Sequence, residues 1–218
     1  MLDNEVSARQ PLAEVGAEGG PAPVQRRKRG KELRAAVHAA VLDELREGGI
    51  AALTMDAVAA RARTGKATLY RHWPGKIELV LDAFQCSTPR IEIPDDDGDL
   101  RGQLLAVLRQ IAGAIDSPHG DAVLGMIAEL LRAPELADSL RPHIVIPFTD
   151  SIMEVLRRAA VRGQIPAAAL TPRVAMVGHD LLLTQAIING TAVPDAAVIE
   201  IVDLVLLPLL RGYSVPSA

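Results

Sequence analysis

Residues 54–76 read TMDAVAARARTGKATLYRHWPGK, and this stretch decides the fold of the N-terminal part of the chain. Thr54 is a good helix N-cap, and apolar residues follow it at helical spacing, which predicts a first short helix. After a tight turn, a second helix is expected to start at Gly65 or Lys66. It should end before Pro74, because proline disfavours helix at the residue that precedes it. Two short helices joined in this way are typical of a helix-turn-helix, whose second helix enters the major groove of DNA.

The faces of the second helix separate because successive residues advance about 100° around the axis. Leu69 and Trp73 lie close together and form the side that we expect to be buried. The opposite side would contact base edges, and residues flanking it would contact phosphates on the groove walls. The base-facing set is Ala67, Thr68 and Arg71, and the flanking set is Lys66, Tyr70 and His72. Lys76 begins the next helix, where its charge and the free N–H groups suit a phosphate.

The segment resembles the DNA-binding domain of the TetR/AcrR family of transcriptional regulators. The resemblance covers about Arg29 to Phe84 and rests on Gly48-Gly49-Ile50, Leu53-Thr54-Met55, Val58-Ala59, and Thr68-Leu69-Tyr70-Arg71-His72-Trp73 followed by Lys76 and Leu79. In that family, the residues matching Tyr70, His72 and Lys76 typically contact phosphates. Those matching Lys66, Ala67, Thr68 and Arg71 face the bases.

Two positions in the turn depart from the family pattern. Arg63 stands where the family usually has a glycine, and Gly65 stands where it often has a capping serine. A left-handed conformation at Arg63 would cost on the order of 1 kcal/mol. We expect Arg63 to compensate by contacting a phosphate. Thr54 and Thr64, at the two ends of the first helix, complete the expected DNA-contacting set.

The positive charge of the chain is concentrated around this segment. The whole 218-residue chain has a formal net charge of −4. Residues 24–76 hold twelve Lys and Arg against five Asp and Glu, whereas residues 77–218 hold ten against eighteen. A basic domain in an acidic chain indicates DNA binding, and the acidic remainder discourages nonspecific contact elsewhere.

Composition narrows the class of protein. Hydrophobic residues make up 49% of the chain and aromatic residues only 2%, which predicts an aliphatic core. The single cysteine, Cys86, excludes an intramolecular disulfide and suits a reducing cytoplasm. Residues 1–20 lack the hydrophobic stretch of a signal peptide, and Asp203 and Pro208 interrupt the apolar C-terminal run. We therefore expect a soluble, cytoplasmic protein that does not contact a membrane.

The chain is predicted to be all-α and to divide into three parts. These are a disordered tail (1–24), a three-helix helix-turn-helix domain (25–88) and a helical effector-binding and dimerisation domain (89–218). The basic run Gln25–Lys31 is interpreted as an arm that follows DNA, with an ordinary solvated charge run as the alternative. Further helices are expected at about 30–47, 98–116, 119–132, 135–140, 143–162, 172–190 and 194–211.

The last two expected helices point to a second copy of the chain. Across residues 198–210 apolar side chains occur all around the helix, and such a helix must be buried on all sides. The resemblance implies the same, because the final two helices of TetR-like regulators build a homodimeric four-helix interface. A two-fold dimer presents two recognition helices to successive major grooves, which implies a palindromic double-stranded operator.

The resemblance also implies that a small-molecule effector binds the C-terminal domain and releases the operator. From residue 90 onward the only aromatic residues are Phe148 and Tyr213, which favours an aliphatic or weakly polar effector. Candidate ligand contacts are Met126, Glu129, Phe148, His179 and Thr184. Each of them is equally interpretable as an ordinary core or interface residue.

An enzyme is disfavoured by the absence of catalytic motifs. The five histidines are scattered, His119 and Asp121 are the nearest to a metal-ligand pair, and no Gly-x-Ser-x-Gly occurs. We therefore expect no catalysis, cofactor or metal. Another alternative remains open, namely a helical DNA-binding regulator or interaction module with no small-molecule effector. Activation in place of repression is also open.

Overall fold

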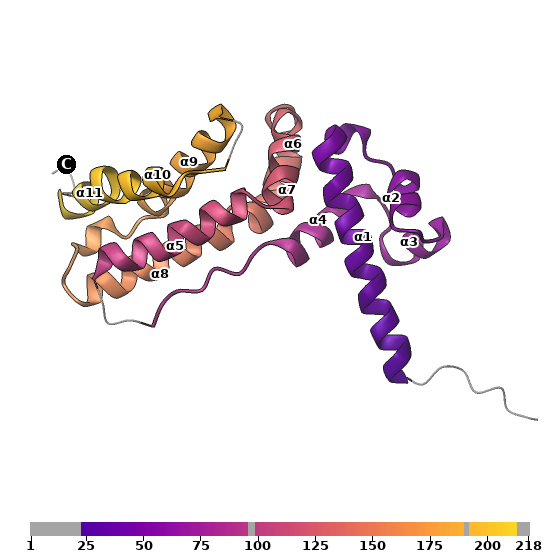
Figure 1. Ribbon diagram of the computed structural model, residues 1–218, viewed down its shortest axis with the longest axis horizontal. Coiled ribbons are helices and arrows are strands. Elements are labelled where there is room, and N and C mark those ends of the chain that lie inside the picture. The colour runs from indigo at the N-terminus through magenta and orange to yellow at the C-terminus, as the bar shows by residue number, and fades with distance from the viewer. Residues whose placement is uncertain (1–22, 96–98, 190–191, 213–218) are drawn as a thin grey trace, which may run out of the picture.

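The structure is a computed structural model that describes residues 23–95, 99–189 and 192–212, and over those ranges it contains helices and no strands (Figure 1). The elements are α1 (Pro23–Ala52), α2 (Met55–Arg61), α3 (Lys66–His72), α4 (Lys76–Ser87), α5 (Leu100–Ile115), α6 (Pro118–Arg132), α7 (Pro134–Ile144), α8 (Ile146–Val161), η1 (Ala167–Ala169), α9 (Pro172–Asn189), α10 (Asp195–Glu200), the π-helical η2 (Ile201–Leu206) and α11 (Leu207–Gly212). The all-α prediction is confirmed. Across the described ranges, none of the helices combines the length and apolar character that a membrane span requires.

The two short helices of the helix-turn-helix form as predicted. α2 begins after Thr54, whose Oγ1 accepts a hydrogen bond from the Ala57 N–H at 3.1 Å. This cap satisfies one of the donors that a helix start leaves free. α3 begins after Gly65 and gives way to extended backbone at Trp73, just before Pro74. Figure 1 places both helices at one end of the molecule, beside α1.

α1 is longer than the expected helix at 30–47. It begins at Pro23 and continues to Ala52, and only Gly49 departs from helical geometry, with φ 67° and ψ −177°. Glycine adopts that conformation far more readily than other residues, so the long helical stretch ends at this glycine pair, as expected, and a short helical turn follows it to Ala52. The basic run Gln25–Lys31 lies within the first turns of α1. The predicted tail lies outside the described residues except for its last two positions.

Most helices of the C-terminal half lie within three residues of their expected bounds. α7 is the exception, because it contains Pro142 and extends to Ile144, whereas the expected helix ends at about residue 140. Pro142 is exposed, so water can replace the backbone hydrogen bond that its ring removes. The final helical stretch, 195–212, passes through the π-helical η2. The apolar pattern gave no signal of that irregularity.

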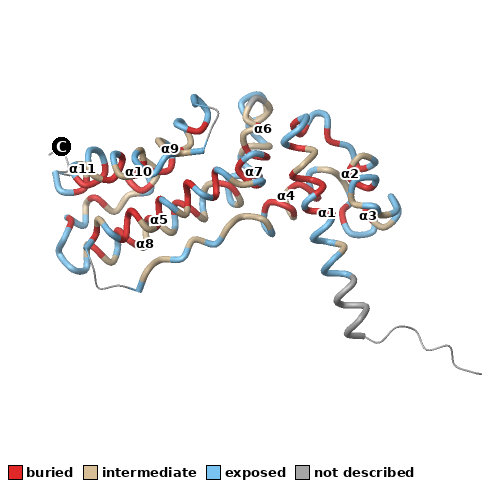
Figure 2. Tube along the Cα trace, in the orientation of Figure 1, coloured by how far each residue is buried: buried red, intermediate tan, exposed pale blue. Residues whose placement is uncertain are grey.

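The apolar core forms two clusters. One joins α5, α8, α9 and the C-terminal helices. The other joins α1–α4 with residues of α6 and α7, among them Val123, Met126 and Leu140. α6 lies so close to α1 that a Cβ at Gly125 would come within 2.5 Å of the Leu45 carbonyl oxygen. The second cluster therefore contains residues from both sides of the predicted domain boundary between residues 88 and 89. The boundary itself stays a prediction. Figure 2 shows buried positions in both groups of helices.

Candidate nucleic-acid interface and effector cavity

α3 buries one side and exposes the other. Leu69 is fully buried and Trp73, at the C-terminal end of α3, is 4% exposed, as the helical spacing predicts. None of the ten residues expected to contact DNA is buried. Thr64, Thr68 and Lys76 are half-buried, and the exposed members are Thr54, Arg63, Lys66, Ala67, Tyr70, Arg71 and His72. All ten are accessible to DNA, and contact at each of them stays a prediction.

The turn between α2 and α3 is left-handed at Arg63, the one non-glycine residue with positive φ (52°) in the described part of the chain. The Arg63 N–H donates to the Ala60 carbonyl at 3.1 Å, and the Thr64 N–H donates to the Ala59 carbonyl at 2.9 Å. These bonds close the C-terminal end of α2. The left-handed conformation considered for Arg63 is confirmed, and it carries strain on the order of 1 kcal/mol.

Two lysines of the DNA-contacting set have protein partners. Lys66 Nζ lies 2.7 Å from Asp56 Oδ1, and this hydrogen bond raises the pKa of Lys66. Lys76 Nζ donates to the Ile50 carbonyl oxygen at 3.0 Å. Lys66 thereby connects α3 to α2, and Lys76 connects α4 to the end of α1. A DNA phosphate that binds either lysine would have to share the ammonium group with its protein partner or displace that partner. The sequence gave no indication of these two intramolecular contacts.

α2 is fastened to α1 by an arginine. Arg61 donates from Nε to Glu44 at 2.7 Å and from Nη2 to Glu47 at 2.6 Å. A guanidinium matches carboxylates with several donors in a fixed plane, so these bonds restrict the rotation of α2 about its own axis. The helix that precedes the recognition helix is thus held by contacts 14 and 17 residues apart in sequence.

A second polar cluster fixes the end of α3. Asp82 on α4 accepts from Arg34 Nη2 at 2.7 Å and from Trp73 Nε1 at 2.9 Å, and His38 Nε2 lies 2.8 Å from the same carboxylate. Burial alone would raise the pKa of Asp82, but the hydrogen bonds from Arg34, His38 and Trp73 outweigh it and lower that pKa. We call Arg34, His38, Trp73 and Asp82 the Asp82 cluster. It connects α1, α4 and the end of the recognition helix.

The same region holds a group of possible metal ligands. Donor atoms of His38, Asp82 and Cys86 lie within 4.8 Å of one another, a grouping that the sequence analysis missed. Asp82 already accepts from Arg34 and Trp73, so a metal would have to displace both. We therefore interpret these residues as part of an ion-pair network. Asp121 is exposed whereas His119 is buried, and no described metal grouping includes them.

Two family models match the chain. Residues 38–83 match the model for bacterial regulatory proteins of the tetR family, and residues 94–205 match the tetracyclin repressor-like C-terminal domain. An uncharacterised HTH-type transcriptional regulator of Mycobacterium tuberculosis is 36% identical over 172 residues, which cover 79% of this chain and 85% of the relative. The chain belongs to the TetR family.

Other relatives agree with this assignment. The DNA-binding transcriptional repressor TetR of Mycobacteroides abscessus is 34% identical over 196 residues, which cover 84% of this chain and 96% of the relative. The crystal structure of the TetR family transcription regulator SCO0332 has a TM-score of 0.60 at 29% identity, and the match covers 85% of this chain and 100% of that one. This TetR-family protein is accordingly a helix-turn-helix transcriptional regulator and not an enzyme.

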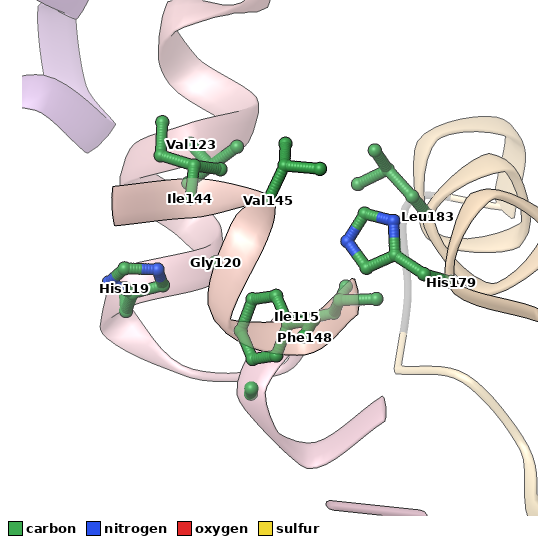
Figure 3. A pocket seen from close by; sticks show the side chains of 10 residues that line it. Ile115, His119, Gly120, Val123, Ile144, Val145, Phe148, His179 and Leu183 are labelled. Atoms are coloured by element: carbon green, nitrogen blue, oxygen red, sulfur yellow. The ribbon is translucent and has the colours of Figure 1, made fainter. Parts of the chain in front are cut away.

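The C-terminal half of this TetR-family protein contains a partly open cavity of about 50 Å³ lined by residues of α5, α6, α7, α8 and α9. Two of the five predicted ligand residues line it. Phe148 and His179 stack with ring centroids 5.6 Å apart and an angle of 21° between their planes. Figure 3 shows His179 entering from α9 and Phe148 lying near the middle of the site. Ligand contact at either residue stays a prediction.

The other three predicted ligand residues do not line this cavity. Met126 is fully buried in the core cluster that α6 shares with the helix-turn-helix. Glu129, also on α6, lies near Gly49, where a Cβ would approach its Oε1 to 3.1 Å. Thr184 is exposed and donates to the Asp180 carbonyl of its own helix at 2.8 Å. Their helices were placed well, but periodicity could not tell which face of each helix borders the cavity.

His119, which the sequence analysis considered only as a possible metal ligand, also lines the cavity. His119 is 4% exposed, its Nδ1 lies 3.1 Å from Ser87 Oγ, and its ring packs edge-on against Phe84 with centroids 5.0 Å apart. Burial lowers the pKa of His119 to about 4, so the imidazole is neutral at neutral pH. The Ser-Pro pair that caps α6 could have suggested that His119 lies in a first helical turn.

The last helices expose apolar side chains. Ile188 on α9 is 75% exposed and Leu204 on η2 is 71% exposed, and their neighbours Ile187 and Val205 are 50% and 37% exposed. The expected interface helices therefore keep apolar residues uncovered in the single chain. Scattered apolar residues are normal on a surface, but pairs on two adjacent helices indicate an interaction surface.

Proposed function

We propose that this protein is a cytoplasmic, homodimeric repressor that binds a palindromic operator through the major groove and leaves it when a small molecule occupies the C-terminal cavity. The observation that carries the proposal is α3, whose sequence from Lys66 to His72 has no acidic residue and buries only Leu69. Three contacts hold α3 and its neighbours in place: the Asp82 cluster, the Arg61 pairs and the Lys76 bond to α1. A rigid, basic helix on an otherwise acidic chain suits base readout.

The test of DNA readout is fluorescence anisotropy with the DNA upstream of the protein's own gene and with random DNA. Arg71→Ala and Thr68→Ala should each weaken specific binding by about 1–3 kcal/mol and relax the preference at one operator position. Arg132→Ala is the matched control, because Arg132 is an exposed arginine on α6, away from α3. Equal losses on specific and random DNA for Arg71→Ala and Thr68→Ala would contradict the assignment of these residues to base readout.

Dimerisation is supported by the uncovered apolar residues of α9 and η2. A two-fold axis between these helices would carry two recognition helices, and helix-turn-helix dimers read half-sites about 34–36 Å apart or multiples of that spacing. The interface of the final two helices is the one that the family resemblance implies. Sedimentation equilibrium of the purified protein tests the assembly, and a monomer at micromolar concentration would argue against it.

Effector release is supported by the cavity, which at about 50 Å³ holds only a few atoms. A wider groove of about 540 Å³ beside Arg141, Asp150 and Arg173 has room for a larger molecule. A regulator that binds DNA without any small-molecule effector is the alternative function. A thermal-shift screen of small neutral molecules, followed by operator release with each hit, separates the two. Hits that stabilise the protein and release DNA support the repressor with an effector, whereas a screen without hits supports the alternative.

A further inference from the structure

One buried polar atom in the C-terminal half has no hydrogen-bond partner, and it belongs to a residue that lines the cavity. The atom is Nε2 of His119. The other ring nitrogen, Nδ1, lies 3.1 Å from Ser87 Oγ. Buried polar atoms are nearly always hydrogen-bonded, because an unpaired one gives up its hydration without replacement. His119 borders the cavity, but this nitrogen is itself buried, so a polar group of a ligand reaches it only after a small shift of the ring or of the atoms that cover it.

The cavity limits the charge and size of that ligand. Apart from His119 and His179, its described lining residues are apolar or glycine, and none is Asp, Glu, Lys or Arg. Figure 3 shows the two imidazoles on opposite sides, with Val145 and Phe148 between them. An ionised molecule would therefore lose its hydration without gaining a counter-charge. The volume of about 50 Å³ also excludes a large molecule unless the helices move apart.

We propose that the effector is a small, neutral, largely aliphatic molecule with one hydrogen-bonding group, and that this group pairs with Nε2 of His119. The proposal rests on the proposed function, in which the cavity is the effector site. It assigns His119 as the polar anchor in place of the residues that the sequence suggested. His179 supplies a stacked ring wall with Phe148, and its Nδ1 lies 3.2 Å from Asp180 Oδ1.

The same pairing determines which ring nitrogen of His119 carries the proton. The ring is neutral, so one nitrogen donates and the other accepts. A carbonyl oxygen in the cavity accepts from Nε2–H, and Nδ1 then accepts from the Ser87 hydroxyl. A hydroxyl that donates to Nε2 keeps the proton on Nδ1, which donates to Ser87 Oγ. The Ser87 hydroxyl is then free to donate to the Phe84 carbonyl, which lies 3.5 Å away.

Ser87 connects the protonation pattern of the His119 ring to the DNA-binding helices. It is the last residue of α4, the helix that also carries Asp82 and Phe84. Phe84 belongs to the same core cluster as Leu69 of α3. A change at the Ser87–His119 contact therefore acts on the end of a helix whose middle holds the recognition helix through the Asp82 cluster.

The experiment compares three small probes of one shape on the full chain: acetone, propan-2-ol and 2-methylpropane. Titration followed by NMR should show acetone and propan-2-ol binding about three- to tenfold more tightly than 2-methylpropane, the effect of one net hydrogen bond. Long-range ¹H–¹⁵N spectra should show acetone moving the His119 proton to Nε2, and propan-2-ylammonium should not bind. Equal affinity for all three neutral probes, no binding of any of them, or unchanged His119 signals on binding would overturn the proposal.

Matched variants locate the anchor. His119→Phe should abolish the preference for the polar probes, whereas His179→Phe should retain it. Loss of the preference in His179→Phe alone would overturn the assignment. If His119→Phe does not fold, the tautomer shift in the unmodified protein still shows whether Nε2 of His119 pairs with the probe. These measurements need no DNA, so failure of the anchor is distinguishable from failure of operator release, which is measured separately by anisotropy with the same probes.

Discussion

Both halves of the molecule have aliphatic cores, but the helix-turn-helix region also has a partly buried carboxylate that joins several segments, whereas the long-range ion pairs of the C-terminal half are single pairs at the surface. Asp82 is the partner of three side chains from two other segments, and its own side chain is only 19% exposed. In the C-terminal half, Asp203 pairs with Arg101 and Asp195 pairs with Arg109, and these carboxylates are 32% and 59% exposed. The carboxylate of Asp82 is therefore the more buried one, although its partner Arg34 is 55% exposed.

The difference corresponds to the role that we propose for each region. A helix that reads bases must be held in one orientation, and directional polar bonds provide this better than apolar contacts. A region that answers a small molecule must have more than one arrangement of similar free energy. The C-terminal half has a cavity, a π-helical stretch and uncovered apolar residues, all of which leave room for rearrangement.

The largest effect should follow removal of the charge at the centre of the Asp82 cluster. Asp82→Asn leaves the buried His38 without its carboxylate partner, removes the ion pair with the exposed Arg34 and weakens the bond to Trp73, so the free energy of unfolding should fall by about 1–3 kcal/mol. Urea denaturation measures it. Asp195→Asn is the matched control in the exposed Arg109 pair and should change little. Equal effects of the two substitutions would remove the proposed contrast between the regions.

Because the pKa of Asp82 is lowered, its contribution to the free energy of unfolding should depend on pH. A carboxyl group whose pKa is lower in the folded state stabilises the fold above its unfolded pKa, and the contribution is lost as the pH falls through the folded value. Acid unfolding of the normal protein below about pH 4 should therefore include the Asp82 contribution, and Asp82→Asn should lack it.

The next effect concerns assembly. Leu204→Glu places an unpaired carboxylate among the exposed apolar residues of the last helices, so the dimer dissociation constant should rise about tenfold to a hundredfold, or about 1.4–2.8 kcal/mol. Leu131→Glu is the control, because Leu131 is 81% exposed but lies on α6. Sedimentation velocity over a range of concentrations measures both. A dimer weakened by Leu131→Glu alone would place the interface elsewhere.

The two regions also differ in how far the sequence revealed them. The helix-turn-helix was predictable because Thr54, Pro74 and the spacing of Leu69 and Trp73 are local signals of helix ends and faces. The Asp82 cluster was not, because its members are brought together only when α1 packs against α4. Similarly, helix periodicity found α6 and α9 but could not show that His119 faces the cavity. Tertiary neighbours of this kind have no signature in a single sequence.

An effect that builds up gradually over more than two pH units should come from His119 in mildly acidic solution. Its pKa is lowered by burial from an ordinary value of 6.5 to about 4, so the unfolded chain binds more protons between these values. The free energy of unfolding should decrease as the pH falls from 6.5 to 4, by at most about 1.4 kcal/mol per pH unit. Denaturation at several pH values measures the slope. His119→Phe should flatten it in that window, and an unchanged slope would mean that His119 is not buried in its neutral form.

The smallest effect on stability is expected at the turn. Arg63→Gly relieves the left-handed strain of about 1 kcal/mol, but glycine also gives the unfolded chain more freedom, which costs about 0.4–1 kcal/mol. These terms oppose each other, so the free energy of unfolding should change by less than about 0.5 kcal/mol. A stability change this small would not explain why an arginine occupies position 63. We therefore attribute the arginine to its positive charge.

The salt dependence of operator binding tests this interpretation of Arg63. If the guanidinium contacts a phosphate, Arg63→Gly should reduce the slope of log K against log salt by about 0.9. Arg63→Lys should retain most of the slope, because it keeps the charge. An unchanged slope in Arg63→Gly would mean that the strained turn serves only to aim α3, and the phosphate contacts would then lie among the remaining residues of the DNA-contacting set.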